Sequence, residues 1–121
     1  MKRHVFTFQP RFVSKVLDGS KSSTIRFRRK REVQVGDIID LRTWSGVPYR
    51  SKQTKLRESQ CVSVESILIS TEIIVGLRYL HGSEIIELAQ TEGFDDTTDM
   101  LRWFYTHHEL PFLGTLYRWT P

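Results

Sequence analysis

The chain has a single cysteine, no long hydrophobic run and few of the usual catalytic motifs, and each absence excludes a class of protein. Cys61 cannot form an intrachain disulfide, so the 121 residues must fold around a hydrophobic core, with Cys61 as a buried thiol. No apolar stretch approaches the roughly 20 residues of a membrane span. The N-terminal MKRHVFTFQPRF has no apolar segment typical of a signal peptide. We therefore expect a cytoplasmic protein with no membrane partner.

Signatures of metal binding are missing as well. His107 and His108 are adjacent, and adjacent side chains on a helix diverge by about 100°, so these two cannot share one ion. With one cysteine and no HxxxH spacing, we expect no metal and no cofactor. The sequence also contains neither a GxSxG elbow nor a glycine-rich phosphate loop.

Charge is distributed unevenly along a chain of otherwise ordinary composition, with 39% hydrophobic and 26% charged residues. Residues 1–60 hold 15 Lys/Arg and 5 Asp/Glu, a net charge of +10, whereas residues 61–121 hold 3 and 9, a net charge of −6. A basic half is typical of proteins that bind a polyanion such as a nucleic acid. Alternatively, the two halves interleave and neutralise each other, and the charge count favours neither possibility.

The apolar patterns predict one α+β domain that spans residues 1–121. Residues 72–77 also fit a short helix, and residues 45–60, which lack an apolar face, fit either a long loop or an extended hairpin. The order of the predicted strands and helices along the chain suggests a small mixed barrel or rolled sheet with helices covering its ends. The predicted strands are 4–8, 23–28, 38–44, 61–70, 72–77 and 115–119, and the predicted helices are 10–18, 82–94 (N-cap Ser83) and 95–108.

The stretch DGSKSSTIRFR leads from a turn into a strand that carries candidate catalytic groups. Side chains alternate along a strand, so Thr24 and Arg26 should share one face, opposite to Ile25 and Phe27. A threonine hydroxyl needs a neighbouring base to act as a nucleophile, and Lys21 can serve if burial lowers its pKa. The alternative, which these residues alone favour, is a solvated lysine and a polar strand face.

Glu92 is placed unusually, at the expected C-terminus of a helix and next to Gly93. A carboxylate is unfavourable there because the last helical turn carries partial negative charge. The placement favours a side chain that points into a pocket and pairs with Lys21 or Arg26. The alternative is a side chain that points to solvent.

Two basic segments suggest contacts with nucleic acid. The run from Arg26 through Arg28, Arg29 and Lys30 to Arg31 is either a solvated loop or a site of phosphate attraction. The loop WSGVPYRSKQ interleaves aromatic and cationic residues, as stacking on single-stranded bases requires. The candidate ligand-binding residues are Arg26, Trp44, Tyr49, Arg50, Ser51 and Lys52.

Two motifs resemble the signatures of the ASCH domain family, which has a PUA-like fold. In FVSKVLDGSKSSTIRFRRKREVQVGDIIDL, a helix that ends in glycine precedes a Lys-Thr-x-Thr-x-Arg pattern, with Ser22 in place of the first threonine, and then Gly36-Asp37. In LAQTEGFDDTTDMLRWF, an acidic residue and Gly-Phe precede a Trp-Phe helix. The segment PYRSKQ resembles a feature of one subset of the family.

The resemblance implies a small β-barrel with helices packed at its rim and a cleft that binds RNA or a modified nucleoside. One bacterial branch of the family is an amidohydrolase that removes the acetyl group of N4-acetylcytidine. Its catalytic set corresponds to Lys21 as base, Thr24 as nucleophile and Glu92 as the group that orients the lysine or shuttles the proton. Arg26 would stabilise negative charge or hold a phosphate.

Two classes of function remain open. The first is an amidohydrolase of N4-acylated cytidine. The second is a non-catalytic module that binds single-stranded RNA, or a weak ribonuclease, since another protein of the ASCH family is reported to cleave RNA. The basic insertion SGVPYRSKQTKL argues against a free nucleoside as substrate. A segment from Arg26 to Arg57 that closes over the cleft would favour a small substrate, and an open basic groove would favour a strand.

Overall fold

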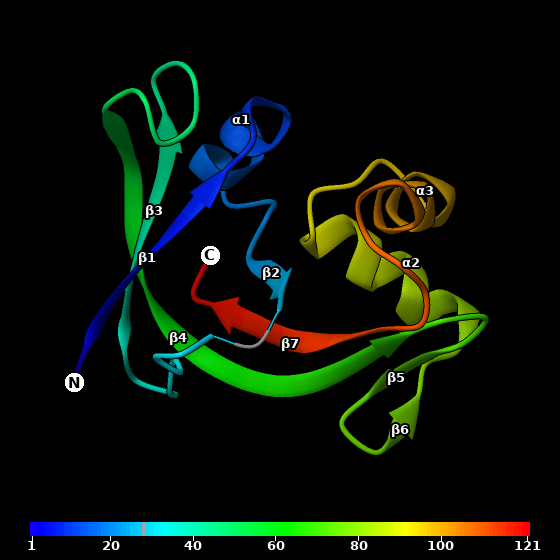
Figure 1. The fold of residues 1–121 in the computed structure, drawn as a ribbon. Coiled ribbons are helices and arrows are strands. Elements are labelled where there is room, and N and C mark those ends of the chain that lie inside the picture. The colour runs from blue at the N-terminus through cyan, green and yellow to red at the C-terminus, as the bar shows by residue number, and fades with distance from the viewer. Residues whose placement is uncertain (28) are drawn as a thin grey trace.

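The computed structural model describes residues 1–27 and 29–121, and these form a mixed sheet of seven strands with three helices (Figure 1). This confirms the α+β prediction. The strands are β1 (Arg3–Phe8), β2 (Ser23–Arg26), β3 (Ile38–Trp44), β4 (Gln53–Ile69), β5 (Ile73–Val75), β6 (Arg78–Tyr79) and β7 (Phe112–Trp119). The helices are α1 (Pro10–Asp18), α2 (Gly82–Thr91) and α3 (Thr97–His107).

The long strand β4 connects the two parts of the sheet, and Figure 1 shows it as one bent strand whose first half runs beside β3 and whose second half runs beneath β7. Its first half pairs antiparallel with β3, which in turn pairs parallel with β1. Its second half pairs antiparallel with β7 and β5. The change of partner falls between Gln60 and Cys61, and a register shift between Cys61 and Ser63 marks a bulge beside it. Bulges bend strands, so this corner folds one part of the sheet towards the other.

The sheet is curved, but no pairing among the described strands closes it into a barrel. The outermost strands of the main path are β1 and β6, while β2 is attached through β7. The rolled sheet expected from the strand order therefore describes the observed pairing better than a barrel does.

The segment 45–60 adopts the extended-hairpin alternative. Residues 53–60 already belong to β4 and pair with β3, and a hydrogen bond from the Ser45 N–H to the Lys52 carbonyl, 2.8 Å, closes the short loop between them. The predicted start of this strand at residue 61 is eight residues too late. Pairing with β3 defines the earlier part, which alternation of apolar side chains does not reveal. Residues 73–75 form a strand and not the alternative short helix.

The N-terminal helix follows the sequence signals closely. Pro10 begins α1, Phe12 and Val16 are buried, and Gly19 ends the helix with a left-handed φ of 85°. Cys61 is buried as expected, and its burial raises the pKa of the thiol.

Capping explains where α2 and α3 begin. His81, and not Ser83, is the N-cap of α2, because the Glu84 side chain accepts a hydrogen bond from the His81 N–H at 3.0 Å. Asp96 caps α3 by accepting from the Asp99 N–H at 2.7 Å, in agreement with the expected acidic cap. None of the helices among the described residues is both long and apolar enough to cross a membrane.

Asp37, of the Gly-Asp pair, is a structural anchor for the start of β1. Its carboxylate accepts from the backbone N–H groups of Lys2 and Gln34, both at 3.0 Å, and lies 2.9 Å from Nε2 of His4. The two backbone N–H bonds, with the His4 contact, hold the pKa of Asp37 well below its usual range. The carboxylate therefore fixes the first strand against the segment before β3.

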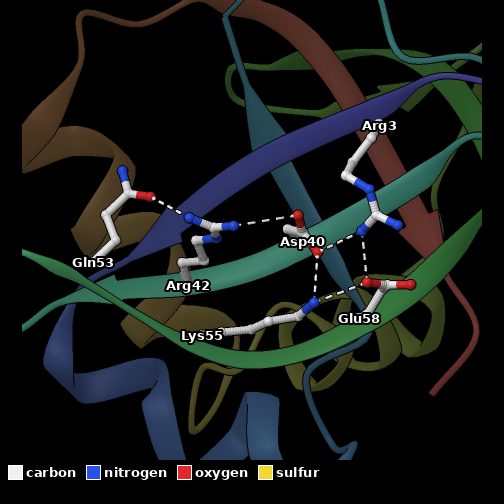
Figure 2. A network of polar contacts seen from close by, with 6 residues as sticks. All are labelled: Arg3, Asp40, Arg42, Gln53, Lys55 and Glu58. Carbon is white, nitrogen blue, oxygen red and sulfur yellow. Dashed lines mark hydrogen bonds and ion pairs between the residues drawn. The ribbon is translucent and has the colours of Figure 1, made fainter.

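A polar network on β1, β3 and β4 neutralises part of the N-terminal positive charge (Figure 2). The buried Asp40 contacts Arg3 at 2.9 Å, Lys55 at 3.1 Å and Arg42 at 3.4 Å. Glu58 bridges Arg3 and Lys55, at 2.6 and 2.8 Å. Three cations therefore share two carboxylates, and the pKa of Glu58 falls to about 2 because Arg3 and Lys55 donate to it.

Other pairs join the basic and acidic halves. Arg11 contacts Asp99 at 2.6 Å and Lys15 contacts Asp95 at 3.3 Å, so α1 is linked to α3 and the segment before it. The halves thus interleave in part. Several cations nevertheless form no ion pair within the part of the chain that the structure describes: Arg29, Lys30, Arg31, Arg50, Lys52 and Arg57.

Gly114 allows β7 to approach β2 closely, which yields a first prediction. A Cβ at this position would lie 2.7 Å from the Arg26 carbonyl oxygen and 2.6 Å from Cε1 of Phe112. We expect Gly114→Ala to lower the free energy of unfolding by about 1–3 kcal/mol, measured by urea denaturation. Gly82→Ala is the control, because a Cβ there meets nothing within 4 Å. Equal stability of Gly114→Ala and the wild type would contradict this packing.

Candidate functional site

A cavity of about 420 Å³ is lined by residues of β1, α1, β2 and α3 and by Glu92 and Phe94 after α2. This volume lies within the range of small-molecule sites. Its polar lining includes Lys21, Thr24, Arg26, Arg29 and Glu92. Aromatic residues line much of the remainder: Phe8, Phe12, Phe27, Phe94, Trp103 and Phe104.

Lys21 is buried, with 3% of its surface exposed. Its ammonium donates to the backbone carbonyls of Ser23 and Glu92 at 2.7 and 2.6 Å, and Nζ lies 4.0 Å from Oε1 of Glu92. Burial lowers the pKa of Lys21 to about 8, although the negative charge of Glu92 acts in the opposite direction. At pH 7 about one amine in ten is therefore neutral and able to accept a proton.

Glu92 is the C-cap of α2, so the unfavourable position expected from the sequence is real. Its side chain is buried and lines the cavity. Oε2 accepts a hydrogen bond from the Ser23 hydroxyl, and the Lys21 ammonium faces Oε1. These two partners offset the repulsion from the helix end and the cost of burying a charge.

Gly93 makes room for the lysine. It has a left-handed φ of 91°, and a Cβ there would lie 3.1 Å from both Cδ of Lys21 and Cδ1 of Phe12. Glycine is the residue that meets both constraints with least strain. The Glu92-Gly93 dipeptide thus supplies the carboxylate and leaves space for its partner.

Thr24 is paired with Arg26 and not with Lys21. The Thr24 hydroxyl oxygen accepts a hydrogen bond from Nε of Arg26 at 2.9 Å, and Nη2 of Arg26 donates to the Thr7 carbonyl at 2.8 Å. Among the described residues, no hydrogen bond joins Lys21 to Thr24. The structure therefore brings together a Lys21–Glu92 pair and an Arg26–Thr24 pair that line one cavity. Proton transfer from Thr24 to Lys21 requires a bridging water or a side-chain rotation.

Ser23 and Phe27 are site residues that the sequence interpretation missed. Ser23 is fully buried and positions Glu92, and its only signal was a small polar residue within a strand. Phe27 was expected on the face away from Thr24, but it lines the same cavity, because β2 ends at Arg26 and the alternation ends with it. Arg28 lies outside the residues that the structure describes.

A second cavity of about 310 Å³ adjoins the first and shares Thr7, Phe8 and Gln9 with it. Trp44 and Tyr49, both predicted to stack on a ligand, line this second cavity, with ring centroids 5.1 Å apart. Tyr49 is 88% exposed, so its ring is available to a ligand.

The remaining loop candidates lie outside both cavities. Ser51 organises the loop, because its hydroxyl donates to the Val47 carbonyl at 2.8 Å and accepts from the Gly46 N–H at 3.0 Å. Arg50 and Lys52 are exposed and line neither cavity. Their predicted contact with a ligand remains a prediction.

The two histidines have separate surroundings. His107 stacks on Trp103 with ring centroids 4.3 Å apart. His108 lines the first cavity and packs against Phe27 with ring centroids 5.2 Å apart. Burial lowers the pKa of His108. Within residues 1–27 and 29–121, no group of three His, Cys, Asp or Glu side chains is arranged to hold a metal ion.

Comparisons with protein-family models, with curated proteins and with solved structures found no match to this chain. The ASCH assignment therefore stays a prediction from the two motifs.

The buried ion pair gives a second prediction. Removing one partner leaves the other charge buried, so Lys21→Met and Glu92→Gln should each destabilise the fold by about 3 kcal/mol. The double variant should be less destabilised than the sum of the single changes, by at least about 1 kcal/mol. Urea unfolding at pH 7 measures the cycle, and Lys30→Met, at an exposed position, is the control. Additive effects would show that the two groups do not interact.

Proposed function

We propose that the protein is an ASCH-type, PUA-like domain that binds an N4-acylated cytidine and hydrolyses its amide. One observation carries this proposal: the buried Lys21–Glu92 pair and Thr24, which is hydrogen-bonded to Arg26, line the same cavity among aromatic side chains. The sequence motifs that resemble the ASCH signatures contribute these same side chains.

The cavity suits a planar base that carries a small acyl group. Phe8, Phe12 and Phe94 offer ring faces or edges to a pyrimidine, and base–aromatic stacking contributes about 1–3 kcal/mol per base. Trp103 also lines the cavity, and its buried indole N–H has no hydrogen-bond partner among the described residues. Buried donors are nearly always satisfied, so an acceptor on the ligand is a suitable partner.

Thr24 is the proposed nucleophile. Its oxygen attacks the acyl carbon while its proton passes to Lys21, through a bridging water or after a rotation of the side chain. The bond between the acyl carbon and N4 then breaks, N4 takes a proton from the Lys21–Glu92 pair, and cytidine leaves. Water hydrolyses the acyl-threonine ester and releases the carboxylic acid. The Arg26 hydrogen bond to Thr24 stabilises negative charge on the oxygen as the proton departs.

A second candidate function is binding of single-stranded RNA without chemistry. The Trp44–Tyr49 cavity favours it, because bases stack on such rings. Phosphates would be attracted to the cations that form no ion pair with the described residues: Arg29, Lys30, Arg31, Arg50, Lys52 and Arg57. It differs from the first candidate in that it does not need the Lys21–Glu92 pair.

Hydrolysis of N4-acetylcytidine to cytidine and acetate is the direct test. Lys21→Ala and Thr24→Ala should each lower kcat/KM by at least about 100-fold, since each removes a group that handles the transferred proton or the acyl carbon. Thr54→Ala, at an exposed position of β4, is the matched control. RNA affinity that falls with salt, in a preparation that releases no cytidine, would reject the first candidate and support the second.

The lowered pKa of Lys21 predicts a pH profile. Because the neutral amine is the base, kcat/KM should rise with pH and level off above about 8. Glu92 raises the pKa of Lys21, so Glu92→Gln should move the titration of the amine to lower pH. The Cε chemical shift of Lys21 measures this independently of the rate. A midpoint that stays in place or rises in Glu92→Gln would contradict the assignment.

A further inference from the structure

Two arginines that line the first cavity, Arg26 and Arg29, are not within ion-pair distance of any carboxylate in residues 1–27 and 29–121, although the charge of Glu92 acts on Arg26. Among the described residues, Arg26 donates to a hydroxyl and a carbonyl, and neither Arg26 nor Arg29 forms an ion pair. Nε of Arg29 is buried and has no hydrogen-bond partner in that part of the chain. Buried donors are normally satisfied, so an unpartnered guanidinium beside a cavity indicates a ligand that accepts hydrogen bonds.

Both guanidinium groups lie against the ring of Phe6. The central carbons of Arg26 and Arg29 lie 5.0 and 4.7 Å from the centroid of the same Phe6 ring. Burial lowers the pKa of Arg26 to about 10, and the positive charge of Arg29 adds to this effect. Arg26 therefore remains charged at neutral pH. Two like charges in a partly dry site repel each other, and an anion between them would relieve the repulsion.

Arg26 also lies near the boundary between the two cavities. Its Nη2 donates to the carbonyl of Thr7, a residue that lines both cavities. A group bound by Arg26 is therefore close to the base site and to the Trp44–Tyr49 rings.

We propose that Arg26 and Arg29 form a phosphate subsite, so that the cavity takes a phosphorylated acylcytidine in preference to the free nucleoside. This inference rests on the proposed function and specifies its substrate class. Arg26 uses two of its five N–H donors in bonds to the described residues, which leaves three for phosphate oxygens. Arg29 adds a second planar guanidinium of the kind that binds phosphate in a bidentate manner.

The test compares kcat/KM for N4-acetylcytidine, for its 3′- and 5′-monophosphates, and for a dinucleotide that contains acetylcytidine. At least one phosphorylated substrate should be favoured over the nucleoside by about tenfold or more, as expected for charge-assisted hydrogen bonds. Arg29→Gln should reduce this ratio to near one. Arg31→Gln removes the same charge from an exposed position of the same loop, outside the cavity, and should leave the ratio unchanged.

The substrates also separate two sources of the phosphate. A dinucleotide favoured over both monophosphates, with the extra preference lost in Trp44→Ala, would identify a strand that occupies both cavities. A monophosphate that equals or exceeds the dinucleotide would identify a free nucleotide. Equal kcat/KM for nucleoside and all phosphorylated substrates, or an unchanged ratio in Arg29→Gln, would overturn the subsite.

If no substrate is hydrolysed, the proposed function is rejected, but the phosphate subsite can still be tested by measuring binding. Calorimetry with cytidine and with its 3′- and 5′-monophosphates then measures the contribution of the phosphate. Tighter binding of a monophosphate by about tenfold, weakened by salt and lost in Arg29→Gln, would support the subsite. Equal affinity for cytidine and the monophosphates would refute it.

Discussion

The buried ion pair between Lys21 and Glu92 is the interaction on which the arrangement of the site depends. An ammonium and a carboxylate are costly to bury separately, and here each has further partners. The ammonium donates to two backbone carbonyls, and the carboxylate accepts from the Ser23 hydroxyl. This pairing holds the segment before β2 against the end of α2, although Lys21 and Glu92 are 71 positions apart in the sequence.

The fold serves this pairing by bringing distant segments together. β4 bends where it changes partner, and β7 pairs with both β4 and β2, so the strand that carries Thr24 is held by the C-terminal strand. Gly93 leaves the space that the lysine stem occupies. Packing and chemistry are therefore coupled. A side chain at Gly93 or Gly114, neither of which lines the first cavity, would displace Lys21 or Arg26.

Local signals in the sequence predicted the elements better than their limits and contacts. The proline and glycine at the ends of α1 and the carboxylate at the end of α2 were informative because each has a local physical cause. The early start of β4 depends on pairing with β3, and the end of β2 depends on pairing with β7, so neither follows from side-chain alternation. For the same reason the role of Phe27 and the choice of Arg26 as the partner of Thr24 required the structure.

The central claim is that an acylated cytosine lies in the first cavity with its acyl carbon at Thr24. The most direct measurement is a crystal structure of Thr24→Ala, which lacks the nucleophile, with N4-acetylcytidine bound. We predict the pyrimidine among the aromatic side chains of the first cavity, and the acyl carbon within about 3.5 Å of the place that the Thr24 hydroxyl occupies in the wild type. A nucleoside bound only against Trp44 and Tyr49, or with its acyl group turned away from position 24, would contradict the claim.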